Sequence, residues 1–594
     1  MTVSERIQAL RGAMSAAGCD AYILPSSDPH ASEYAPAHFT AWQYFSGFPC
    51  ENSNLVVTAD AAAMWVDGRF YGAADAALAG TGIQSMHMGA QGVPDVTAWL
   101  ADTLQPGQVL GYCAETMPLG QLRELQAAAG KAGASTRALH LEDQVWTEDR
   151  PALPATPAWL LAPEYAGQTA GEKLARLREA MGAHTAALVT RLDSVAWLLN
   201  LRAADVADTP YALAFCYVTR TGAALFVDGS RVGEDVRAAL AADGVALYGY
   251  DEIVPYLAGI TEPADVLVDP AALNAALYNA LAENPACTVS EGDDPIQMMK
   301  AVKNETELAC TRRAHIADGA AMVRFQMELE RRLAAGETLH ESDMEEILCR
   351  HRSRDSRFWG KSFGTIAAWG PNAVMMHYAP KKGADAAVER RGFLLVDCGG
   401  TYCDGTTDIT RTYALGPLTE QEKFWYTLVL RSHIDVAMAV WKEGATGGEL
   451  DMLARQPIWR QMLNYRCGTG HSVSHVGAVH EGPHSLRPGN RVAFVPGMVI
   501  TDEPGIYEEG IAGVRIENEL VCADAGESAY GRYLKFEPLT WAPIDTTPVL
   551  TDRLTAEEVD WLNGYHAAVL EKLSPLLDAE EQAWLAAKCA PIGA

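Results

Sequence analysis

Two segments near residues 4 and 171 repeat one another, and this internal duplication constrains the fold more than any other feature. The first reads SERIQALRGAMSAAGCDAYIL, and the second reads GEKLARLREAMGAHTAALV. Both place apolar residues at helical spacing and then continue into an apolar run typical of a strand. Identical residues recur at a constant offset in the pairs Glu5/Glu172, Leu10/Leu177, Arg11/Arg178 and Met14/Met181. We therefore expect two similar α/β domains in succession.

Proline-rich segments near residues 150 and 300 indicate where these two domains end. A chain of 594 residues is too long for one ordinary domain, and the predicted domains are 1–150, 151–303 and 304–594. The third domain alternates helical and strand patterns, which indicates an α+β architecture. Its helices are predicted at 305–335, 339–353 and 420–441, and an amphipathic helical tail follows residue 544.

Five candidate metal ligands follow one another in the third domain. The segment LLVDCGGTYCDGTTDITRTY predicts two antiparallel strands that direct Asp397 and Asp408 to one face. His471 lies in GTGH, Glu503 in TDEPG and Glu517 in RIEN. Four carboxylates repel one another unless about two divalent cations neutralise them. Carboxylate with one imidazole favours Mn²⁺, with Zn²⁺ or Co²⁺ as alternatives, in a centre that activates a bridging hydroxide for hydrolysis.

Each of these residues also has an ordinary interpretation. A single Asp at a turn is usually a turn former, and this is what we expect of Asp404. Glu517 alone fits the polar face of a strand. Together the five favour a metal site, because an unpaired carboxylate beside an apolar run is costly to bury. From these residues alone the substrate of such a two-metal hydrolase stays open.

Several longer motifs resemble one known family. The segments KNETEL, WGPNAVMMHYAP, DGTTDITRT, GTGH, VHEGP, TDEPG, RIEN and FEPLTWAPI are similar to those of the pita-bread metallopeptidases, and most closely to the long, three-domain form of aminopeptidase P. The resemblance covers nearly the whole chain. It implies two creatinase-like α/β N-terminal domains followed by a pita-bread catalytic domain with a C-terminal helical tail. It also implies a homodimer that releases the N-terminal residue from peptides with proline second, normally with two manganese ions.

Residue by residue, the resemblance places the metal ligands at Asp397, Asp408, His471, Glu503 and Glu517. It assigns substrate handling to His377 and His480, where an imidazole can hydrogen-bond the scissile carbonyl or its developing oxyanion. Without the resemblance, either histidine fits a packed core position equally well. Glu503 is expected to act as both ligand and base, passing a proton to the proline nitrogen. Trp369 and Tyr378 are candidates for the pocket wall or for core packing.

Two arginines are further candidates. Arg515 lies two residues before Glu517, so both side chains point to the same side of a strand. A guanidinium there can orient a ligating carboxylate, or it can form an ordinary cross-strand ion pair. The resemblance implies that Arg69, in MWVDGRFYGAA, reaches toward the substrate; otherwise it is a surface arginine at a strand end.

Two motifs depart from the family pattern. SGFPCENSN begins at Ser46 where the family usually reads SGFTGSAG, so the loop after Phe48 is altered and any subunit or substrate contact of this loop is in doubt. His475 lies close to His471 and competes with it in principle as a ligand. The spacing of His471 to His480 favours His471.

Composition excludes other classes of protein. The net charge of −30 offers no basic surplus for nucleic-acid phosphates. We find neither a signal peptide nor an apolar stretch of membrane-spanning length, and we expect a cytoplasmic protein. The 12 cysteines form no CxxC pair, which favours reduced thiols, and no motif supplies a base for Cys398 as a nucleophile. Two alternatives stay open: a prolidase restricted to Xaa-Pro dipeptides, and a non-catalytic pita-bread peptide-binding protein.

Overall fold

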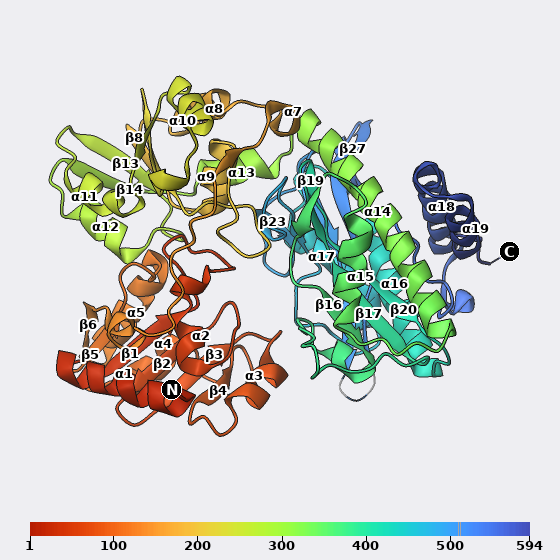
Figure 1. The fold of residues 1–594 in the computed structure, drawn as a ribbon, viewed down its shortest axis with the longest axis horizontal. Helices are drawn as coiled ribbons and strands as arrows, with labels where there is room; N and C mark the ends of the chain where they lie inside the picture. Colours follow the sequence, from red (N-terminus) through yellow and green to blue (C-terminus); the bar gives the residue numbers. More distant parts are fainter. Residues whose placement is uncertain (509, 511, 594) are drawn as a thin grey trace. The chain divides into compact units, whose positions relative to one another are not determined.

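The computed structural model describes residues 1–508, 510 and 512–593, and its chain divides into two compact units (Figure 1). The first unit comprises Met1–Leu161 and Gln168–Ile296. The second comprises Ala162–Gly167 and Gln297–Ala594. Each unit is described below by itself.

The first unit contains two six-stranded sheets with the same topology. One has the strand order β4-β3-β2-β1-β5-β6 and the other β12-β11-β10-β8-β13-β14, with parallel and antiparallel neighbours in corresponding places. The duplication predicted from the sequence is therefore confirmed. The strands are β1 (Ala21–Pro25), β2 (Asn54–Thr58), β3 (Ala62–Val66), β4 (Gln84–His87), β5 (Val109–Tyr112), β6 (Ser135–Ala138), β8 (Ala186–Val189), β10 (Phe215–Thr219), β11 (Ala223–Phe226), β12 (Val245–Tyr248), β13 (Ala264–Val268) and β14 (Cys287–Glu291).

The repeated residues are explained by how the first helix of each half begins and packs. Helix α1 (Val3–Ala17) starts with a capping box between Thr2 and Glu5, and α8 (Ala170–Ala180) starts with the same box between Thr169 and Glu172. Such a box satisfies two backbone N–H groups that lack partners within the helix. The matched leucines and methionines are buried beneath both helices. The shared positions thus encode the start and the apolar face of one helix.

The second unit surrounds short sheets with long helices (Figure 1). Its helices are α14 (Glu305–Ala334), α15 (Asp343–Arg352), α16 (Glu420–Ala437), α17 (Gly447–Trp459), α18 (Ala556–Leu573) and α19 (Ala579–Lys588). Its main strands are β16 (Ile366–Trp369), β17 (Phe393–Cys398), β20 (Ile409–Ala414), β21 (Val440–Lys442), β22 (Gly470–Ser472), β23 (Glu481–Leu486), β24 (Val499–Asp502), β25 (Gly505–Glu508), β26 (Ala512–Arg515), β27 (Asn518–Ser528) and β28 (Gly531–Pro538). The predicted helical tail is confirmed, and Leu562, Val569 and Leu585 bury it in the core of this unit.

One predicted helix is too long. The segment 420–441 begins as helix α16, but the helix ends at Ala437 and Val440–Lys442 form strand β21. This strand pairs with β28, where Val440 lies opposite Lys535 and Trp441 opposite Leu534. Trp441 packs there against Phe536, with ring centroids 4.5 Å apart. Pairing with a strand almost a hundred residues later overrides the local helical pattern.

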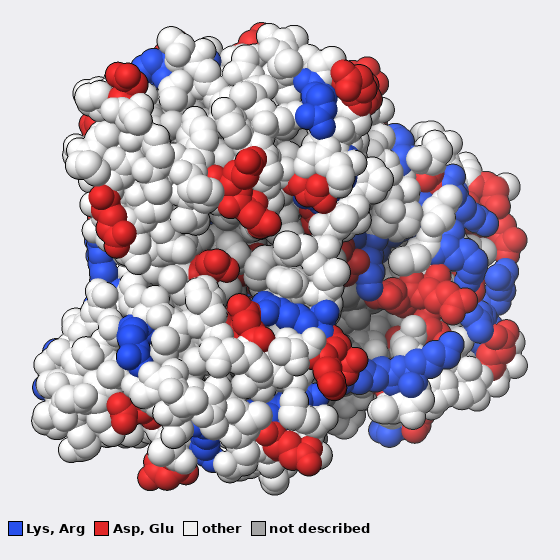
Figure 2. All heavy atoms as spheres, turned by 60° about the vertical axis from the view of Figure 1, so that its left-hand side comes forward, with Lys and Arg blue, Asp and Glu red and all other residues white. Residues whose placement is uncertain are grey.

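The surface and the helices bear on two further expectations. On the face drawn in Figure 2, the Lys and Arg side chains of the described residues are interspersed with Asp and Glu, so no continuous basic area forms there. Among the described residues, no helix combines the length and the apolar composition needed to cross a lipid bilayer.

Candidate metal centre

The five predicted ligands come from strand ends that meet in the second unit. Strand β17 pairs antiparallel with β20, and Asp397 faces Thr410 across this pair while Asp408 directly precedes β20. The predicted antiparallel strands are therefore present. His471 lies on β22, Glu503 follows β24, and Glu517 lies between β26 and β27. Five separate segments thus contribute one side chain each.

The side chains converge on a small volume. His471 Nε2 lies 3.4 Å from an oxygen of Asp408 and 3.4 Å from an oxygen of Glu503. One donor atom each of Asp408, His471 and Glu517 lies within 4.8 Å of the others. Separations of this size let several donors contact one cation at about 2.0–2.2 Å.

Arg515 joins the remaining carboxylate to this group. Its Nη2 donates a short hydrogen bond to Asp397 Oδ2, and its Nη1 donates to the hydroxyl of Tyr507 at 2.7 Å. Its Nε donates to Thr410 Oγ1 at 3.1 Å, and the Thr410 hydroxyl donates to Glu517 Oε2 at 2.7 Å. One guanidinium therefore orients two predicted ligands, Asp397 directly and Glu517 through Thr410. Arg515 therefore forms an ion pair, and its role in orienting a metal ligand stays a prediction.

The electrostatics of the group call for cations. Burial, followed by the charges of Asp397 and Glu503, raises the pKa of Asp408 well above its usual range. Burial and the charge of Asp408 likewise raise the pKa of Glu517. Asp397 Oδ1 and Asp408 Oδ1 are buried without a hydrogen-bond partner in the described part of the chain. Buried, unpartnered carboxylate oxygens in a mutually repelling set fit divalent metal ions, which would supply the missing partners.

The backbone and small side chains fix the orientation of His471 and Glu503. The Nδ1 of His471 lies 3.1 Å from the carbonyl of Ser472 and donates to it, which leaves Nε2 as the free ligand nitrogen. The amide of Glu503 donates to Thr469 O at 2.7 Å, and the Thr501 hydroxyl donates to Glu503 Oε1 at 3.3 Å. Hydrogen bonds of this kind set the tautomer and direction of a ligand before metal binds.

Two pairs of polar residues outside the five lock the strands behind them. Glu519 accepts the backbone N–H of Asp408 at 2.7 Å and lies 3.3 Å from His315. His433 contacts the side chain of Asp502 at 3.0 Å. Asp502 is the residue before Glu503, so this pair fixes the backbone that carries a predicted ligand.

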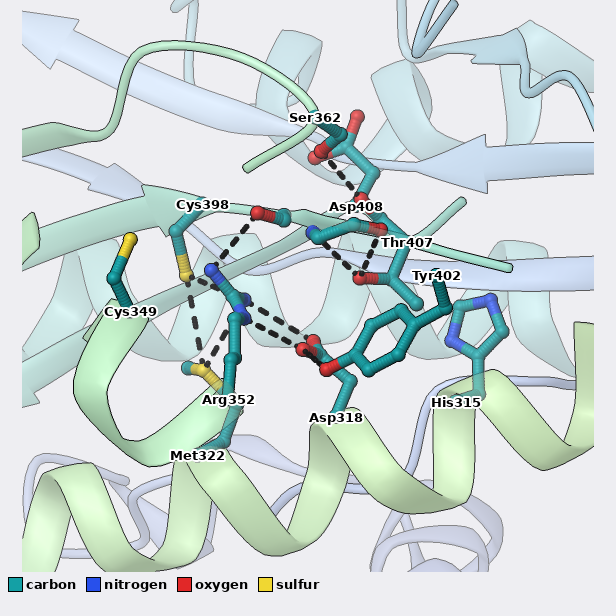
Figure 3. Close-up of polar contacts among 12 residues, drawn as sticks. His315, Asp318, Met322, Cys349, Arg352, Ser362, Cys398, Tyr402, Thr407 and Asp408 are labelled. Atoms are coloured by element: carbon teal, nitrogen blue, oxygen red, sulfur yellow. Dashed lines mark hydrogen bonds and ion pairs between the residues drawn. The ribbon is translucent and has the colours of Figure 1, made fainter. Parts of the chain in front are cut away.

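A buried arginine holds the other face of strand β17, as Figure 3 shows. Arg352, on α15, donates to both oxygens of Asp318 at 2.6 and 3.1 Å and to the carbonyl of Gly399 at 2.9 Å. The Tyr402 hydroxyl also donates to Asp318 at 2.8 Å. Arg352 Nη2 lies 3.3 Å from Cys398 Sγ, and burial raises the pKa of this thiol to about 12. Cys398 therefore faces this network with a protonated thiol. The sequence motifs supply no base for it as a nucleophile.

The two predicted substrate-handling histidines occupy different surroundings. The ring of His480 packs edge-on against His471, with centroids 4.2 Å apart. The next residue, Glu481, is buried between Lys300 and Lys303, which lie 3.3 and 2.9 Å from its Oε1. His377 is half-buried in the loop that follows the 3₁₀ helix η4 (Gly370–Val374). His480 thus lies beside the candidate centre on a segment anchored by two lysines.

The loop that carries His377 is organised by Glu341, which the sequence did not reveal. Its carboxylate accepts the backbone N–H of Trp369 at 2.6 Å and of Ala386 at 3.0 Å. It also accepts the side chains of Asn372 at 3.0 Å and Tyr378 at 2.7 Å. The hydroxyl of Tyr378 and the backbone of Trp369 therefore help to hold this loop through their hydrogen bonds to Glu341. Glu341 is completely buried.

Other predicted residues lie elsewhere or have other partners. Arg69 belongs to the first unit, where its Nη2 donates to Asp67 at 2.6 Å. His475 has its ring nitrogens at Tyr165 O and Thr311 Oγ1, so these contacts engage it away from the ligand group. Asp404 pairs with Arg357 at 2.7 Å and is buried, which is more than the turn former that we expected.

Comparisons with known proteins match this chain to a metallopeptidase family. The family model "Metallopeptidase family M24" matches residues 309–524, and two creatinase/prolidase N-terminal domain models match 6–142 and 149–307. The C-terminal region model of this peptidase family matches 532–592. Aminopeptidase P2 of Arabidopsis thaliana is 37% identical, over 98% of this chain and 88% of its own. A probable Xaa-Pro aminopeptidase P of Neurospora crassa is 36% identical, over 100% and 90%.

A solved structure is similar over its full length. It is X-prolyl aminopeptidase of Caenorhabditis elegans, described as a cytosolic enzyme with a di-nuclear active site. Its TM-score is 0.94 at 32% sequence identity, and the match covers 100% of both chains.

Proposed function

The chain belongs to metallopeptidase family M24, and we propose that it is a dinuclear-metal aminopeptidase that releases the N-terminal residue from peptides with proline in the second position. The observation that carries this proposal is the cluster of Asp397, Asp408, His471, Glu503 and Glu517 in a chain similar throughout to Xaa-Pro aminopeptidases. Peptides with proline second are the substrates. The non-catalytic alternative is disfavoured because all five residues are present.

Each residue of the cluster has a stated role in the proposal. The four carboxylates and His471 Nε2 would hold two divalent ions, which when bound supply Lewis-acid activation of a water and of the scissile carbonyl. Glu503 accepts the proton of that water and passes it to the proline nitrogen as it leaves. Arg515 holds Asp397 in its ligating orientation, and His480 and His377 donate to the substrate carbonyl as charge develops.

Proline at the second position explains why such an enzyme is needed. The nitrogen of an Xaa-Pro bond carries no hydrogen, so a protease that recognises an amide N–H at this position loses that contact. As in any peptide hydrolysis, this nitrogen must also receive a proton as the C–N bond breaks. A glutamate beside the attacked carbonyl can supply it in the second half of the same reaction.

One comparison of substrates separates this activity from that of a prolidase. Purified protein is assayed on an Xaa-Pro-Xaa tripeptide and on the matching Xaa-Pro dipeptide, and release of the first residue is measured. We expect cleavage of the tripeptide. Cleavage of the dipeptide alone would identify a prolidase, and no cleavage together with no bound metal would favour a binding protein.

A single substitution tests the assigned base. In Glu503→Gln, the side chain keeps its size and its contact with Thr501 but can no longer accept the proton. We expect turnover to be abolished while circular dichroism and the unfolding temperature change little. Thr501→Val serves as the control, because it removes the hydrogen bonds of this hydroxyl to Glu503 and to the backbone N–H of His471 but leaves the carboxylate. Near-normal activity in Glu503→Gln would remove this residue from the mechanism.

The metal, the assembly and the location are finer proposals. The oxygen-rich set favours Mn²⁺ over Zn²⁺ or Co²⁺, and metal analysis of protein purified without added metal tests this.

A homodimer is supported by exposed apolar side chains on the second unit, and Met462→Lys with sedimentation analysis tests it. The exposed residues include Val440, Met452, Trp459 and Met462. A cytoplasmic location is supported by the related cytosolic enzyme. The role of Arg69 toward substrate is tested by Arg69→Gln and the resulting change in KM.

A further inference from the structure

A second cluster of metal-binding side chains lies in the first unit, at one edge of its first sheet. Strands β1, β5 and β6 are parallel neighbours, so their carboxyl ends meet at the same edge. Cys113 and Glu115 follow β5, and His140 follows β6. In open α/β sheets, ligands bind outside the carboxyl ends of parallel strands because the loops there converge. The order of the strands therefore brings a thiol, a carboxylate and an imidazole to the sheet edge at which open α/β sheets bind ligands.

The three side chains have the spacing of metal ligands. One donor atom each of Cys113, Glu115 and His140 lies within 4.8 Å of the others. Cys113 Sγ and His140 Nδ1 are 3.7 Å apart. In a tetrahedral zinc site, bonds of about 2.3 Å to sulfur and about 2.0–2.1 Å to nitrogen place these two atoms roughly 3.6 Å apart. The sulfur and nitrogen already hold this separation.

A cavity adjoins the cluster and is acidic. It has a volume of about 100 Å³, and its lining includes Cys113, Glu115, Glu142 and Asp143. Glu142 is buried and accepts the hydroxyl of Tyr22, and Asp143 lies 3.9 Å from His140 Nδ1. The lining also includes Arg150, which is paired with Asp143. Burial raises the pKa of Glu142, but Glu115 and Asp143 still outnumber the one paired guanidinium, and this acidic lining attracts a cation.

We propose that Cys113, Glu115 and His140 bind one thiophilic divalent cation of the zinc class. The buried Cys113 thiol gives its proton to Glu142, with which it shares a hydrogen bond, as the metal–sulfur bond forms, and His140 Nδ1 and a carboxylate oxygen of Glu115 complete a three-residue set. The fourth position faces the cavity, where Asp143 or water completes a tetrahedron. Cys113 is buried, whereas Glu115 and His140 are exposed, so the cation enters from solvent and can be removed again.

This site differs in chemistry from the candidate dinuclear centre. Thiolate ligands select zinc and similar soft cations, whereas a carboxylate-rich set suits manganese. None of the five predicted ligands of the dinuclear centre is a cysteine. The two sites therefore admit different metals, and a metal bound through sulfur distinguishes this site from the dinuclear centre. The proposal stands independently of the peptidase activity.

Cobalt provides the direct test. Co²⁺ is added to full-length protein already saturated with Mn²⁺, and absorption is followed in the near ultraviolet, where thiolate-to-cobalt charge transfer appears. We expect this band to rise to saturation at one Co²⁺ per chain and to disappear on addition of Zn²⁺. Cys113→Ser is expected to abolish the band. Cys19→Ser, which alters another buried thiol of the same half, is the matched control and is expected to keep it.

A second variant covers the case in which Cys113→Ser does not fold. Glu115→Gln changes an exposed residue, so the fold is expected to persist. Loss of even a supporting residue commonly weakens metal affinity 10–100-fold, so the dissociation constant for Co²⁺ should rise by at least about tenfold. Absence of the band in the unaltered protein, or a band that persists in Cys113→Ser, would overturn the proposal. An unchanged affinity in Glu115→Gln would overturn the role of that carboxylate.

Discussion

Glu341→Gln tests whether one buried carboxylate positions the loop that carries His377. The two oxygens of Glu341 accept the backbone N–H groups of Trp369 and Ala386 and the side chains of Asn372 and Tyr378. A glutamine keeps one of these oxygens and replaces the other with an NH₂ group that only donates. Whichever oxygen is replaced, one backbone N–H then meets another donor and cannot rotate away.

The magnitude follows from that count. A hydrogen bond to a charged group contributes about 1.5–3 kcal/mol, and a buried donor left without a partner costs a further 1–3 kcal/mol or so. Asn372 and Tyr378 can reorient, which recovers part of the loss. We therefore expect the loop to be destabilised by about 2–4 kcal/mol, and since about 1.4 kcal/mol corresponds to a tenfold change, its opening should become roughly 30- to 1,000-fold more frequent.

Hydrogen exchange measures this opening directly. Backbone amides between Trp369 and Ala386 are followed by mass spectrometry in the unaltered protein and the variant. Protection in this segment is expected to fall by the stated factor, and kcat/KM on an Xaa-Pro-Xaa tripeptide is expected to fall with it. Metal content should stay unchanged, because Glu341 accepts its hydrogen bonds from Trp369, Asn372, Tyr378 and Ala386, none of which is a predicted metal ligand.

Glu346→Gln is the matched control, since Glu346 lies five residues after Glu341, on helix α15, and is exposed. It removes the same charge without removing the buried acceptor, and it should leave both exchange and activity unchanged. Equal exchange in Glu341→Gln and the unaltered protein would refute the structural argument. Faster exchange with unchanged kcat/KM would refute the link between this loop and catalysis.

Three further substitutions probe other parts of the second unit. Arg515→Gln removes the guanidinium that orients Asp397, and metal affinity measured by chelator competition should fall about 10–100-fold; an unchanged affinity would limit Arg515 to an ion pair. Arg352→Met leaves the Asp318 carboxylate buried without its cation and should destabilise the unit by about 3–5 kcal/mol. Adding Asp318→Asn should recover most of this loss in urea unfolding, and equal losses in the single and double variants would contradict the pairing. Burial lowers the pKa of His566 to about 4 from 6.5, so its neutral form stabilises α18 fully above pH 6.5 and less as the pH falls toward 4. Hydrogen exchange in α18 should accelerate over that interval and do so less in His566→Gln, whereas the same pH dependence in both would assign the effect to another group.

Features encoded in neighbouring residues could be predicted from the sequence. The duplicated helices carry their own capping boxes, and the antiparallel strands around Asp397 and Asp408 carry their own apolar runs. The strand at Val440–Lys442 could not be predicted, because its partner β28 is far away in the sequence. For the same reason Glu341 gave no signal, since its partners lie between Trp369 and Ala386. Glu519 could have been found, because it alternates with Glu517 along a strand pattern.

The charges of the candidate centre explain why it needs two cations rather than one. Four carboxylates converge there, and Arg515 is the cation that contacts one of them directly. Four carboxylates and one guanidinium sum to three negative charges, and this repulsion adds to burial in raising the pKa of Asp408 and of Glu517. One divalent ion would still leave an excess negative charge. Such a charge disfavours nucleophilic attack, because the attack places negative charge on the carbonyl oxygen. Two ions together with Arg515 would offset the charge of the four carboxylates and of a hydroxide, which favours a developing oxyanion. Arg515 thus does more than hold Asp397, because its charge also offsets part of the negative charge of the four carboxylates.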